Sequence, residues 1–432
     1  MCPLFSFFIN MVGIIALIIF IAGYLLITLE HKLNTNKSAV ALSLGAILWI
    51  LAALTTPDKS VISHIVTEAG AEIFQIVVFL LAAMTLVEIL VHYRFFDVIR
   101  TKLARMKLND KKQFAIMGVL TFFLSAVLDN LTITIVMIQI ARQFFSGKNL
   151  VIVAAGIVIL ANAGGAWSPI GDVTTIMLWL AHKFTAIQII TEAFIPSAVL
   201  ALVSGYLMYR QINNTSKDYV VDKPTEFSKS EKFVIGSVLA SFSFPLFMNL
   251  IGLPPYLGLL LGLGVVWAFI EYFKRGSTRT THLDASIETM LQKTDISSLK
   301  FFIGILLAVS ALHVFGILET VSHFIFGEHQ ELQRVVFGSA AIGLLSAIVD
   351  NVPLTALSID LIKLEDPRIW TFLALAVGTG GSALAIGSVA GVVAMGMVKD
   401  LTFGKYLKIA TIPALAGYAA GITAFYLMFF AF

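Results

Sequence analysis

Long apolar runs, separated by short polar segments, make up most of the sequence. A helix that crosses a bilayer needs about 20 predominantly apolar residues, and most of these runs reach or approach that length. We therefore predict an all-α polytopic membrane protein with apolar segments at residues 5–28, 39–56, 70–93, 113–143, 150–182, 185–209, 233–250, 256–273, 299–318, 334–362, 369–398 and 409–431.

The composition supports this prediction. Of the 432 residues, 58% are hydrophobic and 13% are charged, whereas a soluble domain carries roughly 25% charged residues. A soluble core could not remove so much apolar surface from water, which excludes a soluble enzyme and a nucleic-acid-binding protein. The single cysteine, Cys2, excludes an intrachain disulfide and a cysteine-based metal site.

The positive charges predict the orientation of the chain. Residues 94–112 contain seven Lys and Arg residues, and segments of this kind stay on the cytoplasmic side. The resulting topology places 24 of the 29 Lys and Arg residues inside, in the segments 29–38, 94–112, 142–148, 210–232, 274–300 and 399–408.

Two apolar runs are too long for a single plain span. Basic residues flank 113–143 on both sides, which predicts a re-entrant hairpin with its tip at residues 128–131. The same reasoning predicts a second hairpin in 334–362, with its tip at residues 349–353. Since the first hairpin would enter from inside and the second from outside, the two have opposite orientations.

The two hairpin tips resemble each other in sequence. Residues 125–134 (SAVLDNLTIT) match residues 346–355 (SAIVDNVPLT) at a constant offset. Downstream of each hairpin, a glycine-interrupted apolar run predicts a broken helix, at residues 162–172 and at 378–388. Two inverted-topology repeats with broken helices are typical of secondary transporters, whose binding site lies near the midplane where the breaks meet.

The predicted breaks carry oxygen-rich side chains. A broken helix survives in a membrane only where it lines a protein cavity, and its free backbone groups add to the polar side chains there. Hard cations prefer oxygen ligands, so the inventory favours a small alkali cation over a hydrophobic substrate. The side chains are Asp129, Asn130, Thr134, Asp350, Asn351 and Thr355.

Three aspartates in these segments are difficult to explain as structural residues alone. An ionised carboxylate inside a membrane is costly, so Asp129, Asp172 and Asp350 are expected to bind either a proton or Na+ (or Li+). Competition between the two ions for these carboxylates would couple opposite fluxes of H+ and Na+.

Other polar residues in the spans have both a structural and a functional interpretation. Asn130 and Asn351 could also cap broken helix ends, and the glycine pairs could be backbone hinges. Several ionisable residues within the spans could relay protons or sense pH, or could extend their polar ends to the membrane interface. These are Glu68, Glu72, Glu88, His92 and His313.

At Asp129-Asn130 and along residues 161–175 (ANAGGAWSPIGDVTT) the chain resembles NhaD-type sodium/proton antiporters. These belong to the ion transporter superfamily, together with dicarboxylate/sodium symporters and arsenite permeases. The resemblance implies a cofactor-free homodimer of the elevator type in a bacterial inner membrane, which exports Na+ or Li+ in exchange for protons. It implies ion-site residues Asp129, Asn130, Asn162, Ser168, Asp172, Asp350, Asn351, Ser382 and Ser388. Beside these, Thr134, Thr174 and Thr355 are further candidate oxygen ligands.

The resemblance also implies a division into scaffold and transport parts. We expect scaffold helices at 1–69, a first transport repeat at 70–212, a scaffold pair with cytoplasmic connectors at 213–298 and an inverted second repeat at 299–432. Because Ser388 stands where the first broken helix has Asp172, we expect the two repeats to contribute unequally to the site.

Two other functions are alternatives to antiport. A sodium-coupled carboxylate or arsenite transporter of the same fold would favour cationic or Ser/Thr-rich anion clamps, but the breaks contain no Lys or Arg, and the tips carry Asp-Asn where dicarboxylate relatives have Ser-Asn-Thr. An intramembrane aspartyl protease would need Gly-x-Gly-Asp, but Pro169 stands in place of its first glycine. A zinc protease is excluded because no H-E-x-x-H occurs.

Overall fold

The computed structural model describes residues 3–28, 35–214, 226–276 and 278–431, and within these ranges it contains helices and no strand. Cys2 and residues 215–225 of the predicted 213–232 connector lie outside the described residues. The helices are α1 (Pro3–Thr28), α3 (Lys37–Thr55), α4 (Lys59–His92), α5 (Phe95–Arg105), α6 (Asp110–Ser125), α7 (Asn130–Phe144), α8 (Gly147–Gly165), α9 (Val173–Leu180), α10 (Ala186–Gln211), α11 (Lys229–Ser241), α12 (Phe244–Leu250), α13 (Tyr256–Gly276), α14 (Thr280–Leu283), α15 (Ile287–Lys293), α16 (Ile296–Val314), α17 (Ile317–Phe326), α18 (Leu332–Leu345), α19 (Asn351–Leu361), α20 (Pro367–Gly380), the 3-10 helix η1 (Gly381–Ala383), α21 (Val389–Met397), α22 (Phe403–Ile409) and α23 (Thr411–Phe429).

The chain forms two compact units. Unit 1 comprises Met1–Leu81, Asp295–Gly338 and Val352–Leu364, and unit 2 comprises Ala82–Thr294, Ser339–Asn351 and Glu365–Phe432. The four-part division into scaffold and transport segments stays a prediction.

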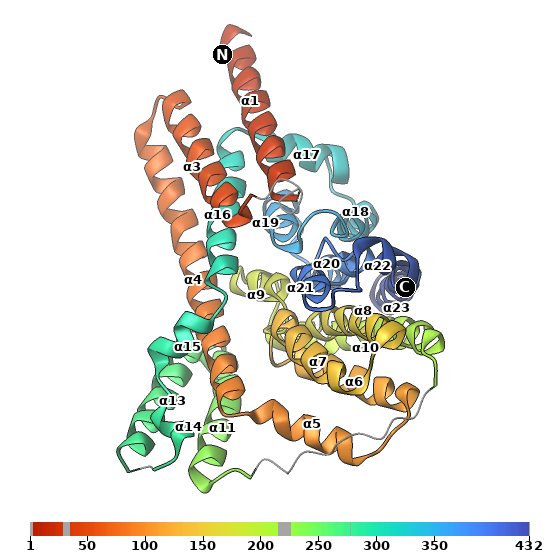
Figure 1. Ribbon diagram of the computed structural model, residues 1–432. Coiled ribbons are helices and arrows are strands. Elements are labelled where there is room, and N and C mark those ends of the chain that lie inside the picture. Colours follow the sequence, from red (N-terminus) through yellow and green to blue (C-terminus); the bar gives the residue numbers. More distant parts are fainter. Residues whose placement is uncertain (1–2, 29–34, 215–225, 277, 432) are drawn as a thin grey trace. The chain divides into compact units, whose positions relative to one another are not determined.

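Unit 1 is built around the pair α3 and α16, with α1 packed beside α3 (Figure 1). The two central helices approach closely through glycines, because a Cβ on Gly45 would lie 2.8 Å from the carbonyl oxygen of Gly304. Small residues of this kind allow membrane helices to pack backbone against backbone. At one end of the pair, the Ser38 hydroxyl donates to the Ser297 carbonyl over 2.7 Å.

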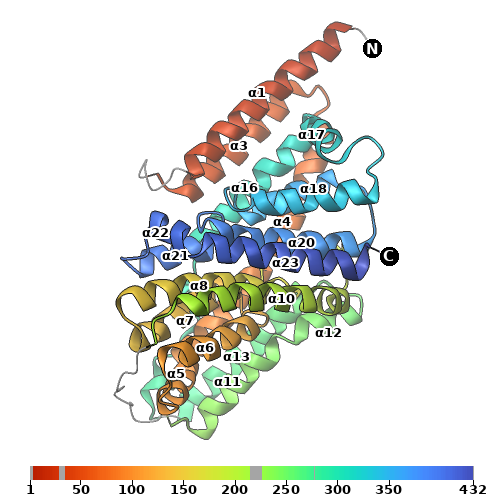
Figure 2. The same ribbon diagram turned by 90° about the vertical axis from the view of Figure 1, so that its right-hand side faces the viewer.

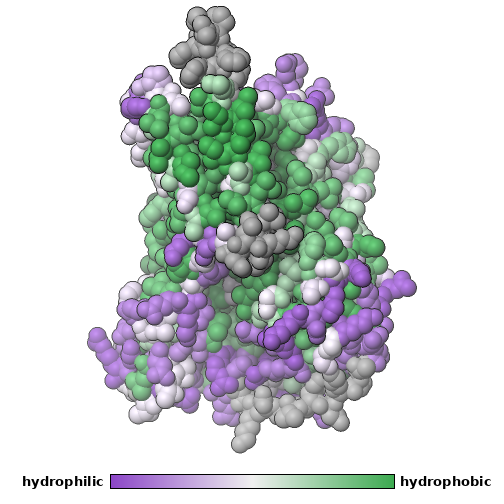
Figure 3. All heavy atoms as spheres, turned by 45° about the horizontal axis from the view of Figure 1, so that its top comes forward, coloured by the Kyte–Doolittle hydropathy of each residue, from purple (hydrophilic) through white to green (hydrophobic). Residues whose placement is uncertain are grey.

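Large apolar side chains remain exposed on the helices of both units. Ile18 is 60% exposed and Leu54 is 77% exposed in unit 1, and Figure 3 shows broad, continuous apolar areas on the face that it draws. Apolar patches of such extent would be unfavourable in water. They fit a lipid environment.

Within the described residues, eight helical segments are long and apolar enough to cross a membrane, as expected of a polytopic membrane protein. The predicted segments 113–143, 334–362 and 369–398 are not among the eight, because their interruptions leave helices of fewer than 18 residues. The predicted span at 233–250 is among them, although it is divided into α11 and α12. Pro245 stands in the first turn of α12, and a proline lacks the N–H that would continue the preceding helix.

Unit 2 contains all four predicted interruptions. The breaks separate α6 from α7, α8 from α9, α18 from α19, and α20 from α21, which confirms the positions predicted from the glycines and the Asp-Asn pairs. The helix α8, the most buried of the eight candidate spans, lies beside α6, α7 and α10, and α10 lies beside α23 (Figure 2). Since α8 carries one break at its C-terminal end, the surrounding helices bury that break.

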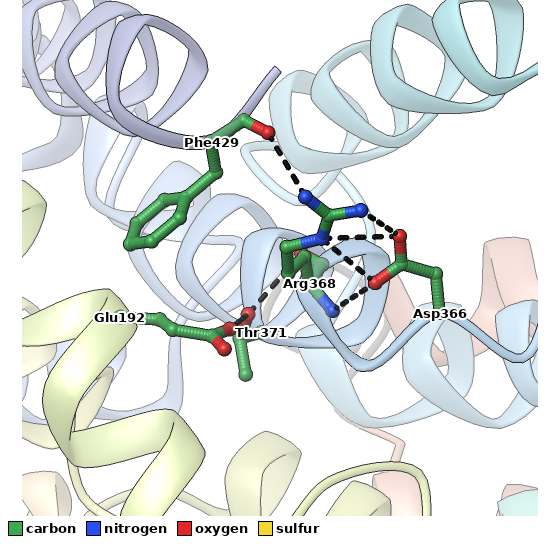
Figure 4. A network of polar contacts seen from close by, with 5 residues as sticks. All are labelled: Glu192, Asp366, Arg368, Thr371 and Phe429. Carbon is green, nitrogen blue, oxygen red and sulfur yellow. Dashed lines mark hydrogen bonds and ion pairs between the residues drawn. The ribbon is translucent and has the colours of Figure 1, made fainter. Parts of the chain in front are cut away.

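A polar network joins three helices of unit 2 (Figure 4). The guanidinium of Arg368 in α20 donates to Asp366, with Nη2 2.7 Å from Oδ2, and to the carbonyl of Phe429 in α23. One helical turn further, the Thr371 hydroxyl donates to Glu192 of α10 over 2.6 Å. The hydrogen bonds from Arg368 hold the pKa of the Asp366 carboxyl below its ordinary value.

The network predicts a pH-dependent contribution to stability. A carboxyl whose pKa is lowered by folding stabilises the fold above its unfolded pKa, and this contribution disappears as the pH falls through the folded pKa. Asp366→Asn is expected to lower the free energy of unfolding at neutral pH by about 1 kcal/mol or less, since the ion pair is partly exposed. Thermal unfolding of the purified protein at neutral and acidic pH measures the difference, which should vanish in acid.

Asp400→Asn is the matched control, because Asp400 is exposed and lies 3.8 Å from Lys405. The interpretation is wrong if Asp366→Asn destabilises equally at both pH values, or no more than Asp400→Asn does.

Candidate functional site

In each broken helix of unit 2, two glycines on either side of the break approach each other closely, as Gly45 and Gly304 do in unit 1. In the first, a Cβ on Gly165 would lie 2.5 Å from the carbonyl oxygen of Gly171. In the second, a Cβ on Gly381 would lie 2.6 Å from the carbonyl oxygen of Gly387. Only glycine permits this approach at either position, so the sequence match between the breaks has a counterpart in their packing.

The contacts between hairpins and broken helices recur as well. A Cβ on Gly164 would collide with the carbonyl of Phe122 in the first hairpin, and a Cβ on Gly380 would collide with the carbonyl of Gly343 in the second. Phe122 and Gly343 are related by the offset that aligns the two hairpin tips. Each hairpin therefore packs on its broken helix through the same pair of positions.

The carboxylate of Asp172 is the meeting point of the polar side chains at the breaks. Asp172 is 1% exposed and caps the N-terminus of α9, where its Oδ1 accepts from the Thr174 backbone N–H over 2.8 Å. The Asn351 amide donates to Oδ1 over 3.2 Å, and the Asn130 amide donates to Oδ2. The two asparagines hold equivalent positions in the two hairpin tips, so both tips contact one carboxylate.

A second set of contacts links the two broken helices directly. The Asn130 amide donates over 3.0 Å to the Oδ1 of Asn162 in α8. The Asn162 amide in turn donates to the hydroxyls of Ser382 over 2.8 Å and Ser388 over 3.1 Å. Asn162, Ser382 and Ser388 are all at least 95% buried. The site is thus a buried polar cluster of carboxylate, amide and hydroxyl groups.

Two further aspartates, Asp129 and Asp350, directly precede the asparagines of the cluster in the two hairpin tips. Asp129 caps α7, where it accepts from the Thr132 N–H over 2.9 Å and from the Thr132 hydroxyl over 2.6 Å. Among the described residues, however, no three His, Cys, Asp or Glu side chains form a metal-binding group. A cation here would need amide, hydroxyl or backbone oxygens in addition to carboxylates.

The other side chains predicted to supply oxygen ligands differ from one another in their hydrogen bonds and in the unit to which they belong. Thr134 is buried one turn beyond Asn130 on the same face of α7, and its hydroxyl has no hydrogen-bond partner among the described residues. The Ser168 hydroxyl accepts from the Ile170 N–H over 3.4 Å, within the first break. Thr355 is buried in the part of α19 that belongs to unit 1.

The predicted proton-relay residues lie on α4 and α16. Glu68 and Glu72 are exposed on α4, and His313 is exposed in the last turn of α16, all in unit 1. In unit 2, Glu88 is half-buried, and the His92 ring nitrogen Nε2 lies 2.9 Å from the Thr281 carbonyl oxygen. Their roles stay predictions.

Two residues near the site were not identified from the sequence as functional. A Cβ on Gly378 would lie 3.9 Å from Asp172 Oδ1, so this glycine leaves room beside the carboxylate. The buried hydroxyl of Tyr406 donates over 2.7 Å to the Ser382 carbonyl and thereby fixes the second break. Gly378 falls inside the predicted break, whereas nothing in the local sequence singles out Tyr406.

A buried carboxylate at the break of an interrupted membrane helix, with two further aspartates at the hairpin tips, defines a class of protein. Charged residues inside a membrane domain mark ion or substrate pathways, and interrupted helices that supply the binding site are typical of secondary transporters. The breaks contain no Lys or Arg, so the fixed charge of the site is negative.

Comparison with known proteins identifies the family. A family model described as "Citrate transporter" matches residues 15–367. The chain is 37% identical to Sodium/proton antiporter 1 of Arabidopsis thaliana, over 94% of this chain and 71% of the relative, and 36% identical to Sodium/proton antiporter 2 of the same plant, over 94% and 97%. It is 28% identical to Na(+)/H(+) antiporter NhaD of Vibrio cholerae, over 95% and 91%. The chain belongs to the transporter family that contains these NhaD-type antiporters, and the resemblance seen in the sequence is confirmed.

The close contact of Gly164 with the first hairpin predicts that adding a methyl group at this position lowers the stability of the protein. Gly164→Ala places a Cβ against the Phe122 carbonyl, so it should lower the free energy of unfolding by about 1–3 kcal/mol, as overpacking does. Gly236→Ala is the control, because nothing lies within 4 Å of a Cβ there, in the exposed interior of α11. That substitution should raise stability by up to about 1 kcal/mol. Thermal unfolding that gives the two variants the same sign of change would contradict this packing.

Proposed function

We propose that the chain is a secondary active antiporter that exchanges Na+ or Li+ for H+, with Asp172 as the group for which the two ions compete. The observation that carries the proposal is the convergence of Asn130 and Asn351 on this one carboxylate. Relatives named as sodium/proton antiporters, at up to 37% identity, support the same exchange.

The cluster has the ligand chemistry that a small hard cation needs. Each asparagine amide carries a carbonyl oxygen as well as its NH2 group, so rotating the amide end by half a turn replaces a donor to Asp172 with an oxygen ligand. The hydroxyls of Thr134, Ser382 and Ser388 are further oxygens within or beside the cluster. Oxygen ligands of this kind suit alkali and other hard cations.

Coupling to protons follows from the burial of Asp172. An ionised carboxylate without a compensating partner is unfavourable in a low-dielectric interior, so Asp172 would carry either a cation or a proton. It would gain little from holding both, because a protonated carboxyl has lost the charge that attracts the cation. A transporter that turns this site from one side of the membrane to the other in both states exchanges the two ions.

An anionic substrate fits the same site poorly. The name of the family model suggests a carboxylate transporter, but Asp129, Asp172 and Asp350 would repel a carboxylate, and the breaks provide no Lys or Arg to hold it. A citrate-type activity is therefore the alternative that the transport experiment must exclude.

We extend the proposal to the architecture of transport. Two inverted-topology repeats, 70–212 and 299–432, would form a cofactor-free transport part that moves as an elevator against scaffold segments 1–69 and 213–298. The recurring contacts of Gly164 and Gly380 support a repeat. A homodimer in a bacterial inner membrane, with residues 94–112 in the cytoplasm, completes the proposal.

The proposal predicts cation-dependent proton movement that depends on Asp172. In everted vesicles with an imposed pH gradient, NaCl or LiCl should dequench a pH-sensitive dye for the wild type, while KCl and citrate should not. Asp172→Asn should abolish the response, because an amide neither binds a proton nor carries negative charge. Asp172→Glu keeps the carboxylate and should restore part of it.

Asp400→Asn, at an exposed position, is the control that should leave dequenching unchanged. The proposal fails if Asp172→Asn retains the sodium response at equal expression. It also fails if no cation elicits a response while citrate is taken up, which would favour the carboxylate transporter.

A further inference from the structure

An apolar groove of about 470 Å³ lies between α6, α8 and α10 of unit 2. It is hollow because small residues recur at helical spacing along its walls, including Gly118 of α6 and Ala201 and Gly205 of α10. Leu160 of α8 forms the floor, where a Cβ on Gly118 would approach its Cδ1 to 2.8 Å. The absence of a side chain at Gly118 thus leaves the space that the end of the Leu160 side chain occupies and deepens the groove.

The groove is open along the side where α6 and α10 expose apolar side chains. Leu202 is 72% exposed and Tyr206 is 60% exposed at its rim. Both belong to α10, which is long and apolar enough to cross a membrane. The opening therefore faces the hydrocarbon of the bilayer, and the molecules that can enter it are apolar chains.

A positive charge stands at one end of the groove. The Lys111 ammonium lies 5.2 Å from the centre of the Tyr209 ring, which lines the groove at the last turns of α10. Among the described residues, Lys111 has no carboxylate within ion-pair distance, and the neighbouring Asp110 accepts from Asn149 over 2.6 Å. This end of α6 follows the basic segment 94–112, which the positive-inside rule places in the cytoplasm.

We propose that the groove binds an acyl chain of an anionic phospholipid from the cytoplasmic leaflet, with the phosphate of the headgroup at Lys111. Along the 16 residues from Phe194 to Tyr209 that border it, α10 rises roughly 24 Å, which is ample for the chain of one leaflet. A second copy of the protein is a poorer occupant. In a two-fold dimer the same surface faces itself, so a groove would meet a groove and Lys111 would find no negative charge.

The far end of the groove connects it to the ion site. Phe122 and Phe194 line the groove there, and Trp167 packs on both, with ring centres 5.9 and 5.0 Å apart. Trp167 lies in the first break, directly before Ser168 and five residues before Asp172. A bound chain would therefore complete the packing of the aromatic wall behind the cluster and should stabilise unit 2.

Native mass spectrometry of the protein in mild detergent tests this site, with dioleoyl phosphatidylglycerol and dioleoyl phosphatidylcholine as the two probes. The wild type should retain the anionic lipid with about a fivefold preference, as expected for one lysine near an anionic group. Lys111→Gln should remove the preference, and the exposed Lys148→Gln should keep it. Ala201→Trp fills the groove and should reduce retention of both lipids by one molecule.

Equal retention of the two lipids by the wild type would overturn the proposal, as would a loss of preference in Lys148→Gln that matches that in Lys111→Gln. An unchanged lipid count in Ala201→Trp, with a shift from dimer to monomer, would assign the groove to a second copy and overturn it as well. Lys111→Gln changes one half-exposed side chain, so the test does not depend on the folding of Ala201→Trp.

Discussion

A buried carboxylate that must always have a partner is the constraint on which the site depends. An unpartnered charge inside a membrane protein is costly, and in this structure the Asp172 carboxylate accepts from Asn130, Asn351 and the Thr174 N–H. These donors can reach it only because both hairpins and the first broken helix end close to it. The interruptions, the glycines that close them and the burial of α8 all serve to bring these ends together.

The two halves of unit 2 share their packing but not their chemistry. Gly164 and Gly380 make equivalent contacts, yet Ser388 occupies the position of Asp172, and Gly378 that of Asn162, under the offset that relates the two breaks. One half therefore supplies the carboxylate while the other supplies hydroxyls and, at Gly378, the space beside it. The sequence predicted this unequal contribution from Ser388 and Asp172. The two breaks are packed in nearly the same way, but only the first carries a carboxylate.

Much of this arrangement could be predicted from the sequence because the signals are local. Glycine pairs, Pro169 and the Asp-Asn tips mark helix ends through backbone chemistry, so all four breaks were located. The convergence of Asn130 and Asn351 on Asp172 could not be predicted, since it depends on how distant helices pack. The same reason applies to Tyr406 and to the groove beside Leu160. The division of 233–250 could have been predicted from Pro245. It was missed because the residues on both sides of the proline are apolar and form one continuous hydrophobic run.

Proton release on sodium binding tests the central claim most directly. Purified protein in weakly buffered detergent is mixed with NaCl, and a pH indicator reports the protons released, with choline chloride as the control for ionic strength. If Na+ and H+ compete for Asp172, the wild type should release protons on addition of Na+ and not of choline, and Asp172→Asn should release none. A wild type that binds Na+ without releasing protons, or an Asp172→Asn variant that releases as many, would contradict the account.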